Sequence, residues 1–207
     1  GVVPVAVNTL LTAEDYAYMM QHSRAQAVLV SAALLPVLQN AMEKAASSGG
    51  HEVRRVIVSR PSGPLPTGME ALEDVITRHE PLGLPAATSP DDPGFWLYSS
   101  GSTGKPKGAL HSHANPYWTA ELYGGPILGL TEKDVCFSAA KLFFAYGLGN
   151  ALSFPLSVGA TVVLMAERPT PDAVFKRWRG DVGGVKPTVF FGAPTGYAGM
   201  LAAPTLP

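Results

Sequence analysis

Residues 95–108 read FWLYSSGSTGKPKG, an apolar run followed at once by a polar loop that is rich in glycine. The first four residues have the apolar and aromatic character of a strand that is buried in a sheet. The polar glycine loop directly follows this strand, at the edge where open α/β sheets bind ligands beyond the carboxyl ends of their strands.

Each residue type in this loop has a physical role toward an anion. Gly101 and Gly104 let the backbone approach phosphate oxygens closely and turn its N–H groups toward them. Hydroxyl groups can donate hydrogen bonds to these oxygens, and lysines add compact positive charge. These side chains belong to Ser99, Ser100, Ser102, Thr103, Lys105 and Lys107. The loop is therefore predicted to bind the phosphates of a nucleotide.

The spacing within the loop excludes two common phosphate-binding motifs. A Walker A loop places Gly-Lys after a glycine and four further residues, but Pro106 stands five residues after Gly101. The dinucleotide fingerprint requires Gly-x-Gly, and Gly101 is followed by Ser102 and Thr103. A P-loop NTPase is thus excluded.

Away from the loop, apolar runs of strand length alternate with segments of helical spacing. Strands are expected at residues 2–7, 27–31, 53–59, 160–165 and 188–191. A first helix is expected from a Thr12 capping box to about residue 22, and a second from residue 34 to the glycines at 49 and 50. Further helices are expected over 72–76 and 171–178. Another is expected to start at an Asn115 cap, with Pro116 at its first helical position. The alternation predicts an α/β fold with a mostly parallel sheet and helices on both faces.

One linker-like stretch divides the chain, since prolines recur at 81, 85, 90 and 93. We expect residues 1–80 to form a first α/β segment, 81–93 a linker, and 94–207 a second segment that carries the phosphate loop. The chain begins without Met in a strand-like run and stops just after an apolar segment, so we interpret it as a piece of a longer protein.

The composition limits the class of protein further. Hydrophobic residues make up 46% of the chain and charged residues 15%, which excludes a disordered chain. The net charge of −1 gives no electrostatic reason to expect nucleic acid or an acidic membrane as a partner. The single cysteine, Cys136, has apolar neighbours and is predicted to be a buried thiol. Because neither a membrane span nor a signal peptide is recognisable, we expect a cytoplasmic location.

The loop resembles the phosphate-loop signature of the adenylate-forming superfamily, which includes acyl-CoA synthetases, peptide-synthetase adenylation domains and firefly luciferase. That signature is Ser/Thr-Ser-Gly-Ser/Thr-Thr-Gly-x-Pro-Lys-Gly, and residues 99–108 match every specified position. The resemblance implies a part of the acyl-CoA synthetase-like N-terminal domain, in which a carboxylate attacks the α-phosphorus of ATP and pyrophosphate leaves. The residues it assigns to the ATP phosphates are Ser99, Ser100, Gly101, Ser102, Thr103, Gly104 and Lys107. Lys107 is the candidate catalytic residue, because it would stabilise the charge on the leaving pyrophosphate.

Residues 141–150, KLFFAYGLGN, carry a second resemblance. Many members of the superfamily have His-x-aromatic in this stretch, which lines the acyl pocket; here Phe144 replaces the His and Tyr146 takes the aromatic position. The stretch resembles the benzoate and hydroxybenzoate CoA ligases, as does the opening of the chain, so the likeness covers nearly all of it. Phe144, Ala145 and Tyr146 would form a pocket that suits a flat ring. The implied substrates are an aromatic carboxylate, ATP and coenzyme A.

Two alternatives stay open. The chain could belong to an enzyme that adenylates another acid (cinnamic, fatty or amino acid), although bulky rings at 144 and 146 argue against a long acyl tunnel. It could also be a nucleotide-binding fragment without catalysis. The resemblance implies that three further parts lie beyond Pro207: the main Mg²⁺ ligand, the ribose-binding Asp and a C-terminal domain with a catalytic Lys. That domain is therefore expected to be absent here, and we expect the 207 residues alone to be inactive. A sheet cut partway exposes an edge, so we also expect self-association, for which a homodimer is one form.

Some residues suggest sites that we do not predict. His111 and His113 have no third ligand nearby in the sequence, so no metal site is expected within the chain. Lys176, Arg177 and Arg179 form a basic cluster that could meet the phosphates of coenzyme A. We interpret this cluster instead as the exposed end of a helix.

Overall fold

The computed structural model describes residues 1–99 and 104–207. Its contacts group into two compact units. The first unit contains Gly1 and residues 8–87 and 98–108, and the second contains residues 2–7, 88–97 and 109–207. The domain boundaries expected from the prolines, at residues 80 and 94, stay a prediction.

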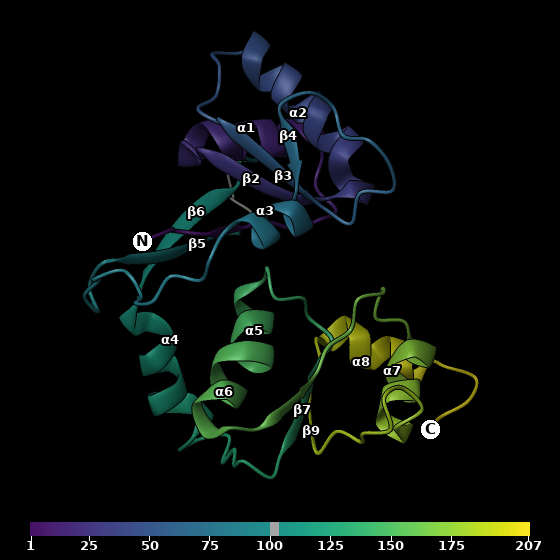
Figure 1. The fold of residues 1–207 in the computed structure, drawn as a ribbon. Coiled ribbons are helices and arrows are strands. Elements are labelled where there is room, and N and C mark those ends of the chain that lie inside the picture. Colours follow the sequence, from purple (N-terminus) through teal and green to yellow (C-terminus); the bar gives the residue numbers. More distant parts are fainter. Residues whose placement is uncertain (100–103) are drawn as a thin grey trace. The chain divides into compact units, whose positions relative to one another are not determined.

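Strands and helices alternate along the chain (Figure 1). The strands are β1 (Val5–Ala6), β2 (Ala27–Ser31), β3 (Arg55–Ser59), β4 (Met69–Ala71), β5 (Pro93–Ser99), β6 (Lys107–Ser112), β7 (Val135–Ser138), β8 (Thr161–Val163) and β9 (Val189–Phe191). The helices are α1 (Ala13–Ser23), α2 (Leu35–Ser47), α3 (Leu72–Arg78), α4 (Ala114–Thr119), α5 (Ala145–Leu148), α6 (Phe154–Val158), α7 (Pro171–Arg179) and α8 (Pro194–Leu201). The described residues also form a 3₁₀ turn, η1 (Ala32–Leu34), and the π-helical turns η2 (Ala120–Gly124) and η3 (Gly149–Ser153).

The strands form three-stranded sheets in the orders β1-β5-β6, β2-β3-β4 and β8-β7-β9. The pairs β1–β5, β2–β3, β3–β4, β7–β8 and β7–β9 are all parallel. The predicted α/β class with mostly parallel strands is therefore confirmed, although the strands divide among separate sheets.

The first unit packs α1 and α2 against the β2-β3-β4 sheet. Ala41 and Ala45 of α2 are fully buried, and small side chains at these positions let the helix approach its neighbours closely. Val58 of β3 is also fully buried in this core. Helix α1 begins with the predicted capping box: the Thr12 hydroxyl accepts from the Asp15 amide at 3.2 Å, and the Asp15 carboxylate accepts from the Thr12 amide at 3.1 Å.

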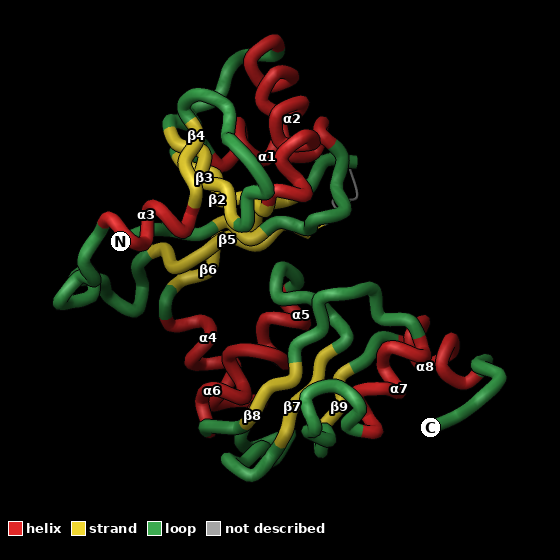
Figure 2. Tube along the Cα trace, turned by 45° about the vertical axis from the view of Figure 1, so that its right-hand side comes forward, coloured by secondary structure: helices red, strands yellow, loops and turns green. Residues whose placement is uncertain are grey.

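In the second unit, helices cover both faces of the β8-β7-β9 sheet (Figure 2). Successive residues of a strand point to opposite faces, and the central strand β7 follows this rule. Cys136 packs on one face with Phe154 of α6, whereas Phe137 packs on the other face with Val174 and Phe175 of α7. Cys136 and Phe137 are both fully buried, which confirms the predicted buried thiol.

The start of α4 differs from the expectation. His113, not Asn115, is the N-cap residue, so Pro116 lies inside the first turn rather than at its first position. The Asn115 side chain instead accepts a hydrogen bond from the Ser112 amide at 3.1 Å and so closes the turn between β6 and α4. Asparagine makes such short-range bonds at turns as readily as at helix caps, which is why the pattern was misread.

Candidate active site

The phosphate-loop sequence begins at the end of β5 and continues to the start of β6. Ser99 is the last residue of β5 and Lys107 is the first residue of β6. Gly104 has a φ of +86°, in the left-handed region that a residue with a side chain rarely adopts. Of the predicted phosphate ligands, Ser100, Gly101, Ser102 and Thr103 lie outside the described residues.

Helix α1 contacts Tyr98, which precedes this loop, and Lys105 within it. The Tyr98 hydroxyl and Nδ1 of the exposed His22 are hydrogen-bonded at 2.8 Å. The Tyr18 ring stacks on His22 with centroids 5.3 Å apart, and Lys105 Nζ lies 5.3 Å from the centroid of Tyr18. Burial, with a smaller effect of Tyr18, raises the pKa of Tyr98 to about 12, so its hydroxyl stays protonated near neutral pH.

The predicted acyl segment follows β7 at the carboxyl edge of the β8-β7-β9 sheet. Phe144 is the N-cap residue of α5, which starts at Ala145, so Phe144, Ala145 and Tyr146 lie together at one helix end. The side chains of Phe144 and Tyr146 are 45% and 50% exposed, which leaves both rings accessible. The Phe143 and Phe144 rings pack with centroids 4.6 Å apart.

Backbone contacts hold this segment in a tight turn. The Ala139 amide donates to the Phe191 carbonyl at 3.0 Å, and the Phe144 amide donates to the Lys141 carbonyl at 3.1 Å. A Cβ atom on Gly147 would lie 2.1 Å from the Lys141 carbonyl oxygen, so only glycine fits at this position. The turn therefore has little freedom to repack.

The Lys141 side chain reaches across the edge of the sheet, a contact that the sequence did not reveal. Its ammonium donates to the backbone carbonyls of Met165 and of Glu167, the latter at 2.6 Å. Both acceptors follow β8 in the chain. Burial lowers the pKa of Lys141, and the nearby Arg177 adds to that effect while Glu167 opposes it.

The basic cluster on α7 is only partly an exposed helix end. Lys176 and Arg179 are exposed, but Arg177 is 5% exposed, so the interpretation was wrong for Arg177. Its guanidinium binds the two carboxylate oxygens of Glu167 at 2.6 and 2.9 Å. A helix contacts the sheet through every third or fourth residue, and Arg177 lies on that inner side together with Val174. The helical spacing of Val174 and Arg177 could have indicated that Arg177 faces the sheet.

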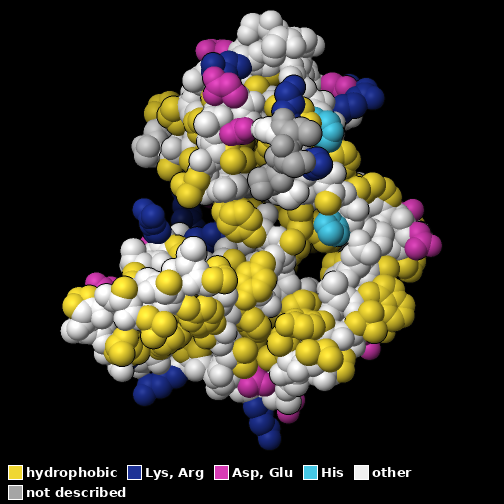
Figure 3. Space-filling view, turned by 180° about the vertical axis from the view of Figure 1, so that it is seen from behind, with side chains coloured by type: hydrophobic (Ala, Val, Ile, Leu, Met, Phe, Trp, Pro, Cys, Tyr) yellow, Lys and Arg dark blue, Asp and Glu magenta, His cyan; other side chains and the backbone are white. Residues whose placement is uncertain are grey.

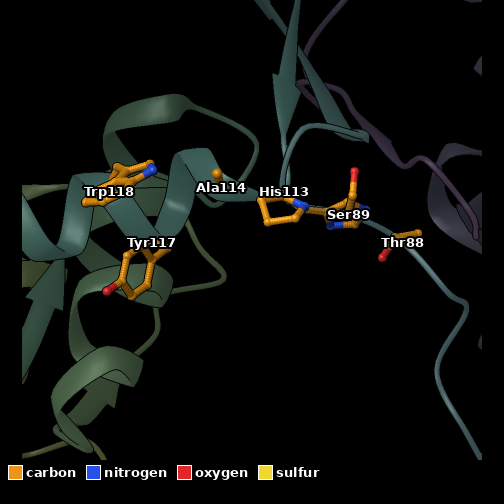
Figure 4. Close-up of a pocket in the computed structure, with 7 residues that line it drawn as sticks. Thr88, Ser89, His113, Ala114, Tyr117 and Trp118 are labelled. Carbon is orange, nitrogen blue, oxygen red and sulfur yellow. The ribbon is translucent and has the colours of Figure 1, made fainter.

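The histidines at 111 and 113 have different surroundings. The His111 ring stacks on Phe95 with centroids 4.8 Å apart and planes 9° apart. His113 lines an open recess of about 420 Å³ with Thr88, Ser89, Pro90, Ala114, Tyr117 and Trp118 (Figure 4). None of the predicted site residues lines this recess. Within residues 1–99 and 104–207, no three His, Cys, Asp or Glu side chains are grouped as a metal ion would require.

The fold and the loop match those of a known family. The AMP-binding enzyme family model matches residues 1–207, and the chain belongs to this family. The chain is 51% identical to the benzoate–CoA ligase of Thauera aromatica, over all of the chain and 37% of that protein. It is 47% identical to the 4-hydroxybenzoate–CoA/benzoate–CoA ligase of Rhodopseudomonas palustris, over 99% of the chain and 35% of that protein. The chain thus spans little more than a third of the length of these relatives.

Solved structures of CoA ligases are also similar to this chain. A benzoate CoA ligase from Burkholderia xenovorans is 53% identical, with a TM-score of 0.83 over all of this chain and 38% of that one. The anthranilate CoA ligase AuaEII, solved in complex with anthranoyl-AMP, is 33% identical, with a TM-score of 0.84 over 98% of this chain and 37% of that one. No helix within the described residues has the length and apolar composition needed to cross a membrane.

Proposed function

We propose that this chain is part of an ATP-dependent ligase that converts an aromatic carboxylate of the benzoate type into its coenzyme A thioester. The observation that carries the proposal is the 51% identity, along the whole chain, to a protein named benzoate–CoA ligase. The complete phosphate-loop signature and the two accessible rings at 144 and 146 support it.

The proposed reaction has two steps. A carboxylate oxygen of the acid bonds to the α-phosphorus of ATP, and the bond from that phosphorus to pyrophosphate breaks. The thiol of coenzyme A then attacks the acyl carbon of the adenylate, and AMP leaves. In the first step, we assign the β- and γ-phosphates to Ser99, Ser102, Thr103 and Lys107, with the Lys107 ammonium stabilising the charge on the leaving pyrophosphate.

The acid is proposed to lie against Phe144, Ala145 and Tyr146. Ring-to-ring contacts of the kind offered by Phe144 and Tyr146 are each worth about 0.5–1.5 kcal/mol beyond the area they bury. The resemblance to adenylate-forming enzymes implies that the main Mg²⁺ ligand lies outside residues 1–207, so we assign Mg²⁺ no step here.

Location and assembly follow as parts of the same proposal. ATP and coenzyme A are both available in the cytoplasm, and a free buried cysteine is compatible with a reducing compartment. Self-association is supported by the apolar side chains that gather on the surface (Figure 3). The exposed ones in the segment from α4 to α6 include Tyr117, Trp118, Leu122, Tyr123, Ile127, Leu152 and Leu156.

Carboxylate-dependent exchange of pyrophosphate into ATP tests the proposal directly. The ligase that contains this chain is assayed with benzoate, 4-hydroxybenzoate, anthranilate, cinnamate and octanoate. We expect exchange with the benzoates and its loss in Lys107→Ala, while Lys133→Ala, an exposed lysine outside the loop, serves as the control. Exchange driven only by cinnamate or octanoate would assign another acid. ATP binding without exchange for any acid would favour the non-catalytic alternative.

A further inference from the structure

Three strand ends meet where the acyl segment lies. Because β8, β7 and β9 are parallel, their carboxyl ends share one edge of the sheet. The segment after the central strand β7 reaches both neighbours: Lys141 binds carbonyls that follow β8, and the Tyr146 hydroxyl binds the Gly192 carbonyl, which follows β9. The turn that carries the two aromatic rings is therefore held from both sides.

The Lys141 contact is directional and charge-assisted. Two of the three donors of its ammonium are used by carbonyls on the β8 side, and one of these carbonyls belongs to the buried Met165. Hydrogen bonds from a charged donor are stronger than neutral ones, and a buried carbonyl without a partner is costly.

The position of Lys141 is transmitted to the rings through the backbone. The Lys141 carbonyl accepts from the Phe144 amide, and the Phe144 carbonyl in turn accepts from the Leu148 amide at 2.8 Å. Gly147 packs directly on the Lys141 carbonyl. A shift at Lys141 must therefore move the first turn of α5, on which Phe144 and Tyr146 lie.

We propose that Lys141 is a positioning residue for the acid-binding site: it holds the Phe144–Tyr146 turn against the β8 side of the sheet edge and so sets the affinity for the aromatic acid. This inference rests on the proposed function, because it takes these rings as the acid-binding surface. Lys141 does not itself touch the acid in this account.

Two variants separate positioning from general stability. Lys141→Met keeps most of the length of the side chain but removes its donors, whereas Lys141→Gln keeps a shorter, uncharged donor and carries the test if the first variant does not fold. Glu167→Gln is the matched control, since it breaks the carboxylate pair with Arg177 but leaves the backbone carbonyl that Lys141 uses. Lys133→Met reports on the loss of an exposed lysine.

The assay is pyrophosphate exchange by the whole ligase, with KM measured separately for benzoate and for ATP, and Tm recorded for each variant. Both Lys141 variants are expected to raise the KM for benzoate by about tenfold or more, while the KM for ATP changes less than about twofold. Glu167→Gln should lower Tm without changing the ratio of the two KM values, and Lys133→Met should change neither.

The outcomes that overturn the inference differ from those that overturn the proposed function. An unchanged KM for benzoate in the folded Lys141 variants, or equal increases for benzoate and ATP, would overturn the positioning role and leave the proposed function intact. No exchange by the wild-type ligase with any aromatic acid would overturn both.

Discussion

The Tyr146 hydroxyl donates a hydrogen bond of 3.1 Å to the backbone carbonyl of Gly192. The two residues are 46 positions apart in the chain, and the bond ties the first turn of α5 to the residue that follows β9. It restrains the orientation of a side chain that is half exposed at the sheet edge.

Substitution of Tyr146 should affect the acid more than the nucleotide. Tyr146→Phe loses one hydrogen bond at a partly exposed site, and we expect the KM for benzoate to rise by about twofold to tenfold. Tyr146→Ala also removes the ring and should raise the KM for benzoate further. In both variants the KM for ATP should stay within about twofold of the wild type. Equal increases for both substrates in steady-state kinetics would contradict the assignment of this residue to the acid pocket.

Arg177 should contribute to stability far more than its neighbour Arg179. Arg177→Met leaves Glu167 without its guanidinium partner. We expect the free energy of unfolding to fall by about 1–3 kcal/mol. This is less than the usual cost of breaking a fully buried pair, because the Glu167 side chain is half exposed. Arg179 pairs with Asp181 at the surface, so Arg179→Met should cost less than about 1 kcal/mol. Urea denaturation of both variants makes the comparison, and similar losses would show that burial of Arg177 does not matter.

The pair between Glu167 and Arg177 should weaken in acid. The hydrogen bond from Arg177 is the main reason that the pKa of Glu167 lies below its ordinary value of 4.5. A carboxyl group with a lowered pKa in the folded protein stabilises the fold above its unfolded pKa, and that contribution is lost as the pH falls through the folded pKa. The wild type should therefore be more stable than Glu167→Gln at neutral pH, and the difference should shrink below pH 4.5.

Comparing the two proteins at each pH cancels the titration of all other acids. Denaturation curves for the wild type and Glu167→Gln are needed at neutral pH and at several values below 4.5. A difference in stability that stays constant over this range would mean that the carboxylate charge contributes nothing to the pair.

Gly147 should not tolerate a side chain. A Cβ at this position would lie 2.1 Å from the Lys141 carbonyl oxygen, a backbone atom that cannot rotate away. Gly147→Ala is expected to lower the Tm of the ligase and to abolish benzoate-dependent exchange. Gly199→Ala on α8 is the control: a Cβ there meets no atom within 4 Å, and alanine favours a helix. Normal exchange by a folded Gly147→Ala protein would contradict the tight turn.

Local patterns predicted many of the elements well. The Thr12–Asp15 capping box starts α1 as expected, and the apolar runs at 27–31 and 188–191 correspond to β2 and β9. These features depend on residues only a few positions apart, so a short stretch of sequence is enough to predict them. β7 was not predicted, because VCFS is too short to separate from its surroundings by period alone. Asn115 was misplaced because one side chain can serve two kinds of turn.

The sequence by itself predicted a phosphate-binding role for residues 99–108, from residue types and spacing that suit a triphosphate, and it determined that Phe144 and Tyr146 stand two positions apart in the acyl segment. The tertiary structure alone decided which atoms Lys141, Tyr146 and Arg177 contact. Those partners lie 26, 46 and 10 residues away. The contacts of Lys141 and Tyr146 form because β7 is placed between β8 and β9 in a parallel sheet, and that of Arg177 forms because α7 packs beside the segment that follows β8. Strand order is set by the packing of apolar faces over the whole unit, and no local pattern of residues encodes it.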